Sequence, residues 1–295
     1  MKSAVIAPSP TEIPLKTDFV ERSTIIAVTG PGGPAREIPR RIPRKATRKK
    51  FKVSPSGVQL SESWIKVNVF AAIHLTGVRL IIKPDLTGKE TLLEYLECSP
   101  QEMNNAFNSA QKVIEYVHER LGESNYWQVS YNELGWLYAG VHTMRGPFIA
   151  ETGVGPGSTT TAILEASKPF RGKLFSFDLG IKYGESEDRP VGFLVPEDVK
   201  DRWTLVLGDT KKTLNGKLSY FGPFDVFFHD SEHTYDHVTF ELETAYANLR
   251  KKFLIVVDNF DWTEAPIDFA KKYDLNLINV VDDMCFIFPR STTPR

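Results

Sequence analysis

Two apolar segments of this chain end in oxygen-bearing side chains. Residues 224–230 read FDVFFHD and end at Asp230, and residues 253–260 read FLIVVDNF and contain Asp258 and Asn259. If both segments are strands of one open α/β sheet, these side chains lie at the edge where such sheets bind ligands. Three oxygen donors with room for water favour magnesium or a similar divalent cation over zinc. The alternative is that they are ordinary polar residues at strand ends.

Two candidates for a general base follow the first aspartate. Glu232 and His233 lie within three residues of Asp230. A cation stabilises the oxyanion of a bound hydroxyl group, so a histidine or glutamate with an ordinary pKa could remove its proton. We favour His233 over Glu232, although His233 could instead be a helix-start residue bonded to backbone. His229 and His237 are expected to be structural, the first because it points away from Asp230 within the strand.

A glycine-rich loop precedes this constellation. Residues 148–164 read FIAETGVGPGSTTTAIL, which predicts a strand, a tight turn and a helix that begins at Ser158. Glycines let the backbone turn sharply and let a ligand approach peptide N–H groups without interference from a Cβ atom. Asp178 ends the next predicted strand, where it could accept hydrogen bonds from both hydroxyls of an adenosine ribose. Taken alone, the glycines would equally fit a tight turn that binds nothing.

The glycine spacing and a nearby carboxylate narrow the choice of ligand. The spacing Gly-x-Gly-x-Gly departs from the Gly-x-Gly-x-x-Gly of nicotinamide enzymes, and Glu151 lies two residues before the first glycine. That carboxylate would serve a pyrophosphate poorly and a sulfonium well. With Glu151, the segment resembles the first motif of class I S-adenosylmethionine-dependent methyltransferases, and LGDT at residues 207–210 resembles their later acid that contacts adenine.

This resemblance implies that the chain is an enzyme with S-adenosylmethionine as its cofactor. It implies that the methionine portion of the cofactor is contacted by Glu151, Gly153, Gly155 and Gly157. It also implies that Asp178 contacts the ribose and that Asp209 contacts the adenine amino group. Two neighbours of these positions are also expected to contact the cofactor, namely Ser158 and Asp230.

The candidate metal ligands carry a second resemblance. Catechol-type O-methyltransferases have an aspartate after the fourth strand and an Asp-Asn pair after the fifth, which matches the three oxygen donors described above. The segment DSEHTY at residues 230–235 is also similar to the macrocin-type sugar and antibiotic O-methyltransferases. Together these resemblances cover about residues 130–290. They imply metal-dependent methyl transfer to a hydroxyl of a small molecule such as a sugar, a polyketide antibiotic or a catechol.

One position departs from the catechol-type pattern. Those enzymes have a lysine three positions after the first metal aspartate, and this chain has His233 there. We expect less regular parts of the chain to select the substrate: residues 183–196, residues 262–266 and the helix that carries Trp136 and His142.

The elements that must position these residues alternate along the chain. Apolar periodicity predicts strands at 148–151, 174–178, 204–209, 224–230 and 253–258, with helices from 158 and at 235–249. This order predicts a Rossmann-like, doubly wound α/β fold with a mostly parallel, seven-stranded sheet. Residues 276–281 and 284–288 are joined by only two residues, so they should form an antiparallel hairpin at one edge.

The first third of the chain has a different character. We predict an N-terminal extension at residues 1–57, a β-hairpin appendage at residues 58–97, and the methyltransferase domain at residues 98–290. Residues 36–52 contain nine Lys or Arg and one Glu, a stretch that could bind phosphates. An RNA or protein methyltransferase guided by this stretch is therefore an alternative function, and a non-catalytic binding module with the same fold is another.

Composition limits the setting. The chain has 295 residues, of which 41% are hydrophobic, and a formal net charge of −1, which suits a globular protein with a large core. Cys98 and Cys285 lie far apart, so we expect no disulfide framework and a reducing, cytoplasmic setting. No apolar run approaches the roughly 18 residues of a membrane span, so we expect no membrane partner. A homo-oligomer is compatible with this composition.

Overall fold

The computed structural model describes residues 84–121, 128–180 and 189–290. The β-hairpin expected at residues 64–83 and the basic stretch at residues 36–52 lie outside the described residues. The described part contains one seven-stranded sheet, ordered β3-β2-β1-β4-β5-β7-β6. Its strands are β1 Phe148–Thr152, β2 Lys173–Asp178, β3 Trp203–Leu207, β4 Phe224–His229, β5 Leu249–Val257, β6 Leu275–Val281 and β7 Met284–Pro289.

The direction of the strands agrees with the predicted fold. β1 to β5 pair in parallel, and β7 pairs antiparallel with both β5 and β6. This confirms the Rossmann-like class, the mostly parallel sheet and the C-terminal antiparallel hairpin. The short link between β6 and β7 leaves no room for a crossover helix, so the two strands must run in opposite directions.

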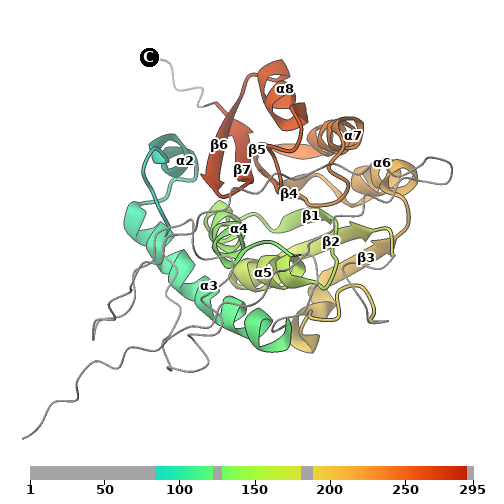
Figure 1. The fold of residues 1–295 in the computed structure, drawn as a ribbon, viewed down its shortest axis with the longest axis horizontal. Helices are drawn as coiled ribbons and strands as arrows, with labels where there is room; N and C mark the ends of the chain where they lie inside the picture. The colour runs from blue at the N-terminus through green and yellow to red at the C-terminus, as the bar shows by residue number, and fades with distance from the viewer. Residues whose placement is uncertain (1–83, 122–127, 181–188, 291–295) are drawn as a thin grey trace, which may run out of the picture. The chain divides into compact units, whose positions relative to one another are not determined.

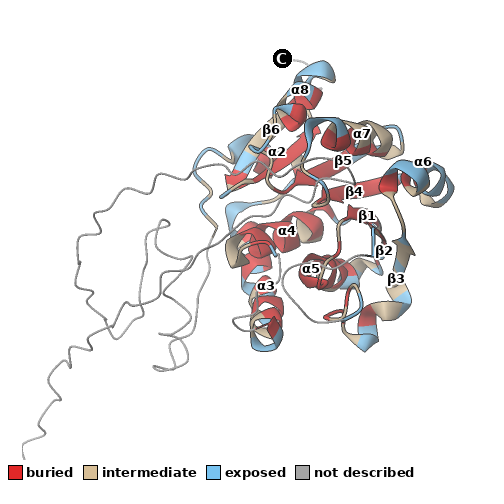
Figure 2. Ribbon diagram, turned by 45° about the vertical axis from the view of Figure 1, so that its right-hand side comes forward, coloured by how far each residue is buried: buried red, intermediate tan, exposed pale blue. Residues whose placement is uncertain are grey.

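Helices cover both faces of the sheet (Figure 1). One face packs against α4 Tyr131–Met144 and α5 Ser158–Ser167, and α3 Pro100–Leu121 packs on these two helices. The other packs against α6 Thr210–Phe221, α7 Tyr235–Tyr246 and α8 Ala265–Lys272. Side chains alternate between the two cores, since Ile149 faces the first and Ala150 the second. β4 is a buried strand (Figure 2), and β5 is buried from Phe253 onward, because helices shield these segments on both sides.

Two helix starts use the same local device. Ser99 and Glu102 exchange hydrogen bonds at the start of α3 and form a capping box. Ser130 and Glu133 form a second capping box at the start of α4. Each box supplies acceptors for backbone N–H groups that have no partner inside the helix.

The described part of the expected appendage packs onto the main core. Residues 84–97 include α2 Glu90–Tyr95, whose Leu92 is buried in the same core as α3 and α4. The Tyr95 hydroxyl donates to the carbonyl of Phe253 at 2.7 Å and accepts from its N–H at 2.8 Å. The predicted boundaries after residues 57 and 97 stay predictions.

Several element boundaries differ from those predicted. β3 ends at Leu207 because Gly208 has a positive φ of 134° and Asp209 begins α6 as its N-cap. β5 begins at Leu249 rather than at Phe253, since its first four residues include exposed side chains that break the apolar pattern. Two further helices, α6 and α8, were not predicted from the sequence. Within the described residues, no helix combines the length and apolar character needed to cross a membrane.

Trp136, on the helix that is expected to help select the substrate, lies away from the surface. Its side chain is 1% exposed and lies in the core between Phe107 and Phe286, with ring centroids at 5.2 and 6.1 Å. Half-buried His142 has its Nδ1 atom 3.1 Å from the carbonyl oxygen of Ala166. The helix that carries both residues is a packing element, because its apolar positions meet helices and strands on several sides.

Candidate active site

The register of the sheet brings the two aspartates together. Thr152 of β1 pairs with His229 of β4, and His229 pairs with Val257 of β5. The next residues on β4 and β5 are Asp230 and Asp258, whose backbone N–H groups donate to the neighbouring strands at 2.9 and 3.0 Å. Parallel strands end at the same edge, so the carboxylates lie side by side at the carboxyl edge of the sheet.

The aspartate pair is accompanied by His233. One side-chain ligand atom from each of Asp230, His233 and Asp258 can be chosen so that all three lie within 4.8 Å of one another. Asp258 is 5% exposed, and its Oδ1 atom has no hydrogen-bond partner among the described residues. Burial, followed by the charge of Asp230, raises the pKa of Asp258 well above its usual range. This pair is therefore costly in its ionised form unless a proton or cation compensates it.

Asn259 is oriented by a different partner. It has a positive φ of 50°, and its Nδ2 atom donates to Oδ2 of Asp283 at 3.2 Å. The sequence analysis expected Asn259 beside the two aspartates as a third metal ligand. The only atom that it could offer a cation is its amide oxygen, since the nitrogen is a donor.

Two carboxylates that the sequence analysis missed adjoin the pair. These are Glu133 and Asp283. One carboxylate oxygen from each of them and one from Asp258 all lie within 4.8 Å of one another. Glu133 is 3% exposed, and it occupies the capping box of α4 through Oε2, which accepts from the N–H of Ser130 at 2.6 Å. The signal in the sequence was Ser-x-x-Glu at residues 130–133, but a capping box explains that pattern without a site.

The glycine loop packs against its own chain at two positions. Gly153 has a φ of 79°, and a Cβ atom there would lie 1.8 Å from the carbonyl oxygen of Asp230. Gly157 has a φ of 96°, and its Cβ atom would lie 2.9 Å from the Cα of Gly192. The segment around Gly192 pairs with the loop, since its N–H donates to the carbonyl of Gly155 at 2.9 Å. These glycines are therefore required by close backbone packing, whatever the loop binds.

Glu151 lies behind the loop. Its carboxylate is fully buried and accepts hydrogen bonds from the hydroxyls of Thr159 and Thr160 at 2.8 Å and of Ser176 at 2.6 Å. Burial raises the pKa of Glu151 to about 7, although the three hydroxyls oppose that shift. The carboxylate thus fastens the start of α5 to β2. Ser158 is also buried, with its hydroxyl 3.4 Å from Oε1 of Gln128.

The two later acids hold backbone groups. Asp178 accepts from the N–H groups of Val154 and Gly155 through Oδ2, at 2.9 and 3.2 Å, and from Gly180 through Oδ1 at 2.7 Å. It therefore shapes the glycine loop directly. Asp209 is the N-cap of α6 and accepts from the N–H of Lys211 at 2.9 Å.

His229 and His237, which are expected from the sequence to be structural, lie in a buried network around Glu241. Glu241 is fully buried, and its carboxylate lies 2.8 Å from Nδ1 of His229 and 2.7 Å from Nε2 of His237. Ser231 also donates to this carboxylate, at 3.0 Å. Hydrogen bonds and the nearby imidazoles lower the pKa of Glu241 despite its burial. The network fixes the segment between β4 and α7, from which His233 reaches the aspartates.

One protein family matches the part of the chain that contains this site. Residues 150–260 match the model of a protein family described as a methyltransferase domain. The match covers less than half of the chain. The matched segment begins in β1 and ends just after β5, so it contains the glycine loop, the strand-end acids and the aspartate pair.

Solved structures provide further comparisons. The cofactor-bound protein Rv0187 from MTB shares 18% identity over 72% of this chain and 99% of its own, with a TM-score of 0.46. TomG, an O-methyltransferase from Streptomyces achromogenes in complex with SAM, shares 17% sequence identity with this chain. The similarity covers 62% of this chain and 90% of TomG, with a TM-score of 0.46. The MycE methyltransferase, in complex with Mg and SAH, shares 18% sequence identity with this chain. The similarity covers 61% of this chain and 55% of MycE, with a TM-score of 0.43. No curated protein matches this chain.

Large apolar side chains are exposed beside the strand-end acids. Leu179 follows Asp178 and is 55% exposed, and Leu207 at the end of β3 is 58% exposed. Trp262, after β5, is 61% exposed, with its ring centroid 5.4 Å from that of His233. Large apolar side chains that stay exposed next to a site are available for a ligand to cover.

Proposed function

We propose that this protein transfers a methyl group from S-adenosylmethionine to a hydroxyl group of a small molecule, at a site that holds a divalent cation. The observation that carries the proposal is the convergence of Asp230, Asp258 and His233 within 4.8 Å at the carboxyl edge of the sheet. This cluster directly adjoins the glycine loop, because Gly153 packs against the backbone of Asp230. A methyl donor on that loop would therefore be next to a hydroxyl held at the cluster.

The residues fit a hard cation. The two aspartates offer only oxygen ligands, and Oδ1 of Asp258 is buried without a partner among the described residues. Asp230 and Asp258 would hold the cation, with the amide oxygen of Asn259 as a further ligand. Such a cation, when bound, supplies Lewis-acid stabilisation of a substrate oxyanion. Most of the rate enhancement would come from orientation and charge stabilisation.

Cofactor binding would depend on the loop and on the exposed rim. Asp178 retains acceptor capacity for ribose hydroxyls, because a carboxylate has about four lone-pair sites and three backbone N–H groups donate to this one. Leu179 and Leu207 would pack against the adenine, with Asp209 near its amino group. Glu151 would act indirectly, by holding α5 and the loop, since its carboxylate is fully buried.

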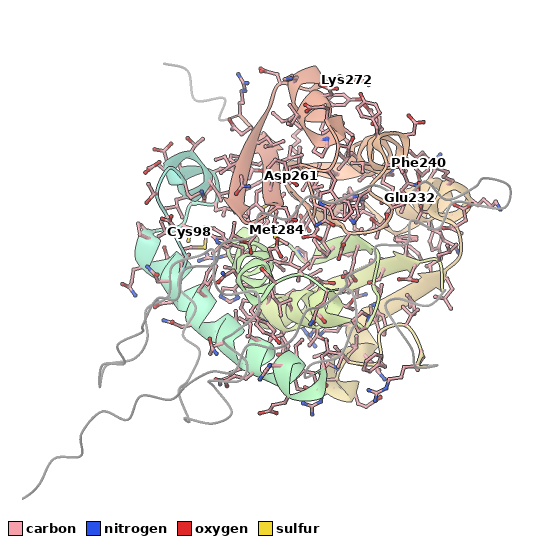
Figure 3. The ribbon with its side chains drawn as sticks, viewed as in Figure 1. Cys98, Glu232, Phe240, Asp261, Lys272 and Met284 are labelled. Atoms are coloured by element: carbon pink, nitrogen blue, oxygen red, sulfur yellow. The ribbon has the colours of Figure 1, made fainter. Side chains whose placement is uncertain are left out.

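The geometry supports His233 over Glu232 as the base. Nε2 of His233 lies 3.7 Å from Oδ1 of Asp230, and its side chain is 15% exposed. Glu232 lies between β4 and α7 (Figure 3), is 57% exposed, and accepts from the hydroxyl of Thr234. Burial lowers the pKa of His233 to about 4, so the imidazole is neutral at pH 7 but is a weaker base than the histidine of ordinary pKa expected from the sequence. Trp262 would offer a flat apolar surface to the substrate.

The test separates cofactor binding from metal-dependent chemistry. Calorimetry would measure S-adenosylhomocysteine binding to the wild type, to Asp258→Asn and to Asp261→Asn. Asp261 is an exposed aspartate three residues along the same loop (Figure 3) and serves as the matched control. A panel of catechols, sugars and hydroxylated polyketides, with radiolabelled S-adenosylmethionine and Mg²⁺, would measure methyl transfer.

We expect all three proteins to bind S-adenosylhomocysteine and only Asp258→Asn to lose methyl transfer, because a buried carboxylate ligand has been removed. Full activity in excess chelator, or in Asp258→Asn, would refute the metal-dependent assignment. Failure to bind S-adenosylhomocysteine would refute the cofactor assignment.

A further inference from the structure

The carboxylate cluster extends beyond the ligands of the proposed cation. Asp258 belongs to two sets of three converging residues, one with Asp230 and His233 and the other with Glu133 and Asp283. The second set joins three segments: the start of α4, the end of β5 and the turn between β6 and β7.

Two buried oxygens in this second set lack partners. Oε1 of Glu133 and Oδ1 of Asp258 have no hydrogen-bond partner among the described residues, and their side chains belong to residues that are 3% and 5% exposed. No described lysine or arginine forms an ion pair with Glu133, Asp230 or Asp258. A buried carboxylate oxygen without a donor loses its solvation and gains nothing in return. A positive ligand at this position would compensate both oxygens together.

We propose that Glu133, Asp258 and Asp283 hold a second divalent cation, so that Asp258 bridges two cation positions. The proposal rests on the proposed function only for the first cation, held at Asp230 and Asp258. The donor set consists of oxygens alone, which selects Mg²⁺ or Mn²⁺ rather than zinc. Opposite ligands in a magnesium octahedron lie about 4.2 Å apart, twice the metal–oxygen distance, so the present separations need only small adjustments.

The surrounding contacts preorganise this second position. Oε2 of Glu133 is held by the N–H of Ser130, which leaves Oε1 for the cation. The hydroxyl of Ser130 donates to Asp282 at 2.8 Å, which ties the start of α4 to the turn that carries Asp283. Asn259 donates to Asp283 and fixes its other side. Bridging by Asp258 would orient its carboxylate toward the first cation, as in two-metal sites where the ions lie about 3.5–4 Å apart.

The experiment counts bound Mn²⁺ on the full-length protein by the loss of the free-ion electron paramagnetic resonance signal. The variants are Glu133→Gln, Asp230→Asn and Asp283→Asn. Glutamine keeps an acceptor for the capping box of α4 and removes the charge. Glu102→Gln is the matched control, because Glu102 has the same capping-box position in α3 but is exposed and outside the cluster. Thermal melting monitors folding, and Asp283→Asn tests the same position if Glu133→Gln fails to fold.

We expect two bound Mn²⁺ ions in the wild type and in Glu102→Gln, and one in each of Glu133→Gln, Asp283→Asn and Asp230→Asn. If the wild type binds one ion and only Asp230→Asn loses it, the second cation position is refuted and the first is supported. One ion that Glu133→Gln removes and Asp230→Asn retains would support the second position and refute the first. No bound ion would overturn both, and would indicate that the carboxyl groups are compensated by protons instead.

Discussion

The packing of Gly153 against Asp230 predicts that the smallest substitution in the glycine loop will damage the aspartate pair. In Gly153→Ala, the new Cβ atom would lie 1.8 Å from the carbonyl oxygen of Asp230 and 2.5 Å from its carbonyl carbon. Contacts under 3.0 Å are essentially absent for real Cβ atoms, so the backbone must move by more than an ångström. Because the atoms involved are backbone, a side-chain rotation cannot relieve the overlap.

The expected loss of stability has two parts. An alanine at a φ of 79° costs about 1–2 kcal/mol, because its Cβ atom crowds the following carbonyl in the left-handed region. Overpacking of a well-packed region costs a further 1–3 kcal/mol, roughly. We therefore expect Gly153→Ala to lose about 2–5 kcal/mol of unfolding free energy.

A matched variant isolates the second part. Gly88 has a φ of 71°, but a Cβ atom there would meet nothing within 4 Å. Urea unfolding of both variants should show Gly153→Ala to be the less stable by about 1–3 kcal/mol. Mn²⁺ affinity should fall in Gly153→Ala and not in Gly88→Ala, because only the former displaces Asp230. Equal costs and unchanged Mn²⁺ affinity would show that the loop does not rest on Asp230.

Three further predictions concern the base, a buried carboxyl and a surface helix. His233→Ala should lower the rate of methyl transfer by about 10²–10⁴ if a general base is lost, with partial recovery at high pH; a fully active variant would shift that role to Glu232 or water. Because burial raises the pKa of Glu151 to about 7, above its ordinary value of 4.5, the protonated form is favoured in the folded state and stability should fall as the pH rises through this window. In Glu151→Gln, the part of this pH dependence that comes from Glu151 should be absent when the unfolding free energy is measured in urea at pH 5 and pH 8. The same pH dependence in the wild type and the variant would contradict the titration of Glu151. Gly216 lies inside α6 with open space around its Cα, so Gly216→Ala should stabilise the protein by about 1 kcal/mol, measured by thermal or urea unfolding; destabilisation would mean that this position is constrained by something other than helix propensity.

The alternation of side chains explains why the fold was predictable. Residues 148–152 and 224–229 are short apolar segments, and their neighbouring side chains face opposite cores. Such segments must be strands covered on both faces, and their alternation with helices leaves a parallel sheet as the simple solution. Parallel strands share a carboxyl edge, so the proximity of Asp230 and Asp258 followed from the sequence as soon as β4 and β5 were identified as neighbours.

Helix boundaries were predictable where local chemistry marks them. Ser99 and Glu102 mark the start of α3 in the sequence, because a capping box is complete within four residues. α6 and α8 escaped prediction for the opposite reason: each lies beside strands that dominate the apolar pattern, and α6 has only three buried residues, Thr210, Leu214 and Leu218. Tertiary packing decides these helices more than local preference does.

The tertiary structure alone decided which polar groups meet. Ser130 and Asp282 bond to each other across 152 residues of sequence, and that contact carries Glu133 and Asp283 to the aspartate pair. The same holds for Gly153, whose lack of a Cβ atom serves the backbone of Asp230. A sequence determines its elements through short periodic patterns, since neighbouring residues share one helix or strand. Contacts between distant segments depend on how complete elements pack, which no local pattern records.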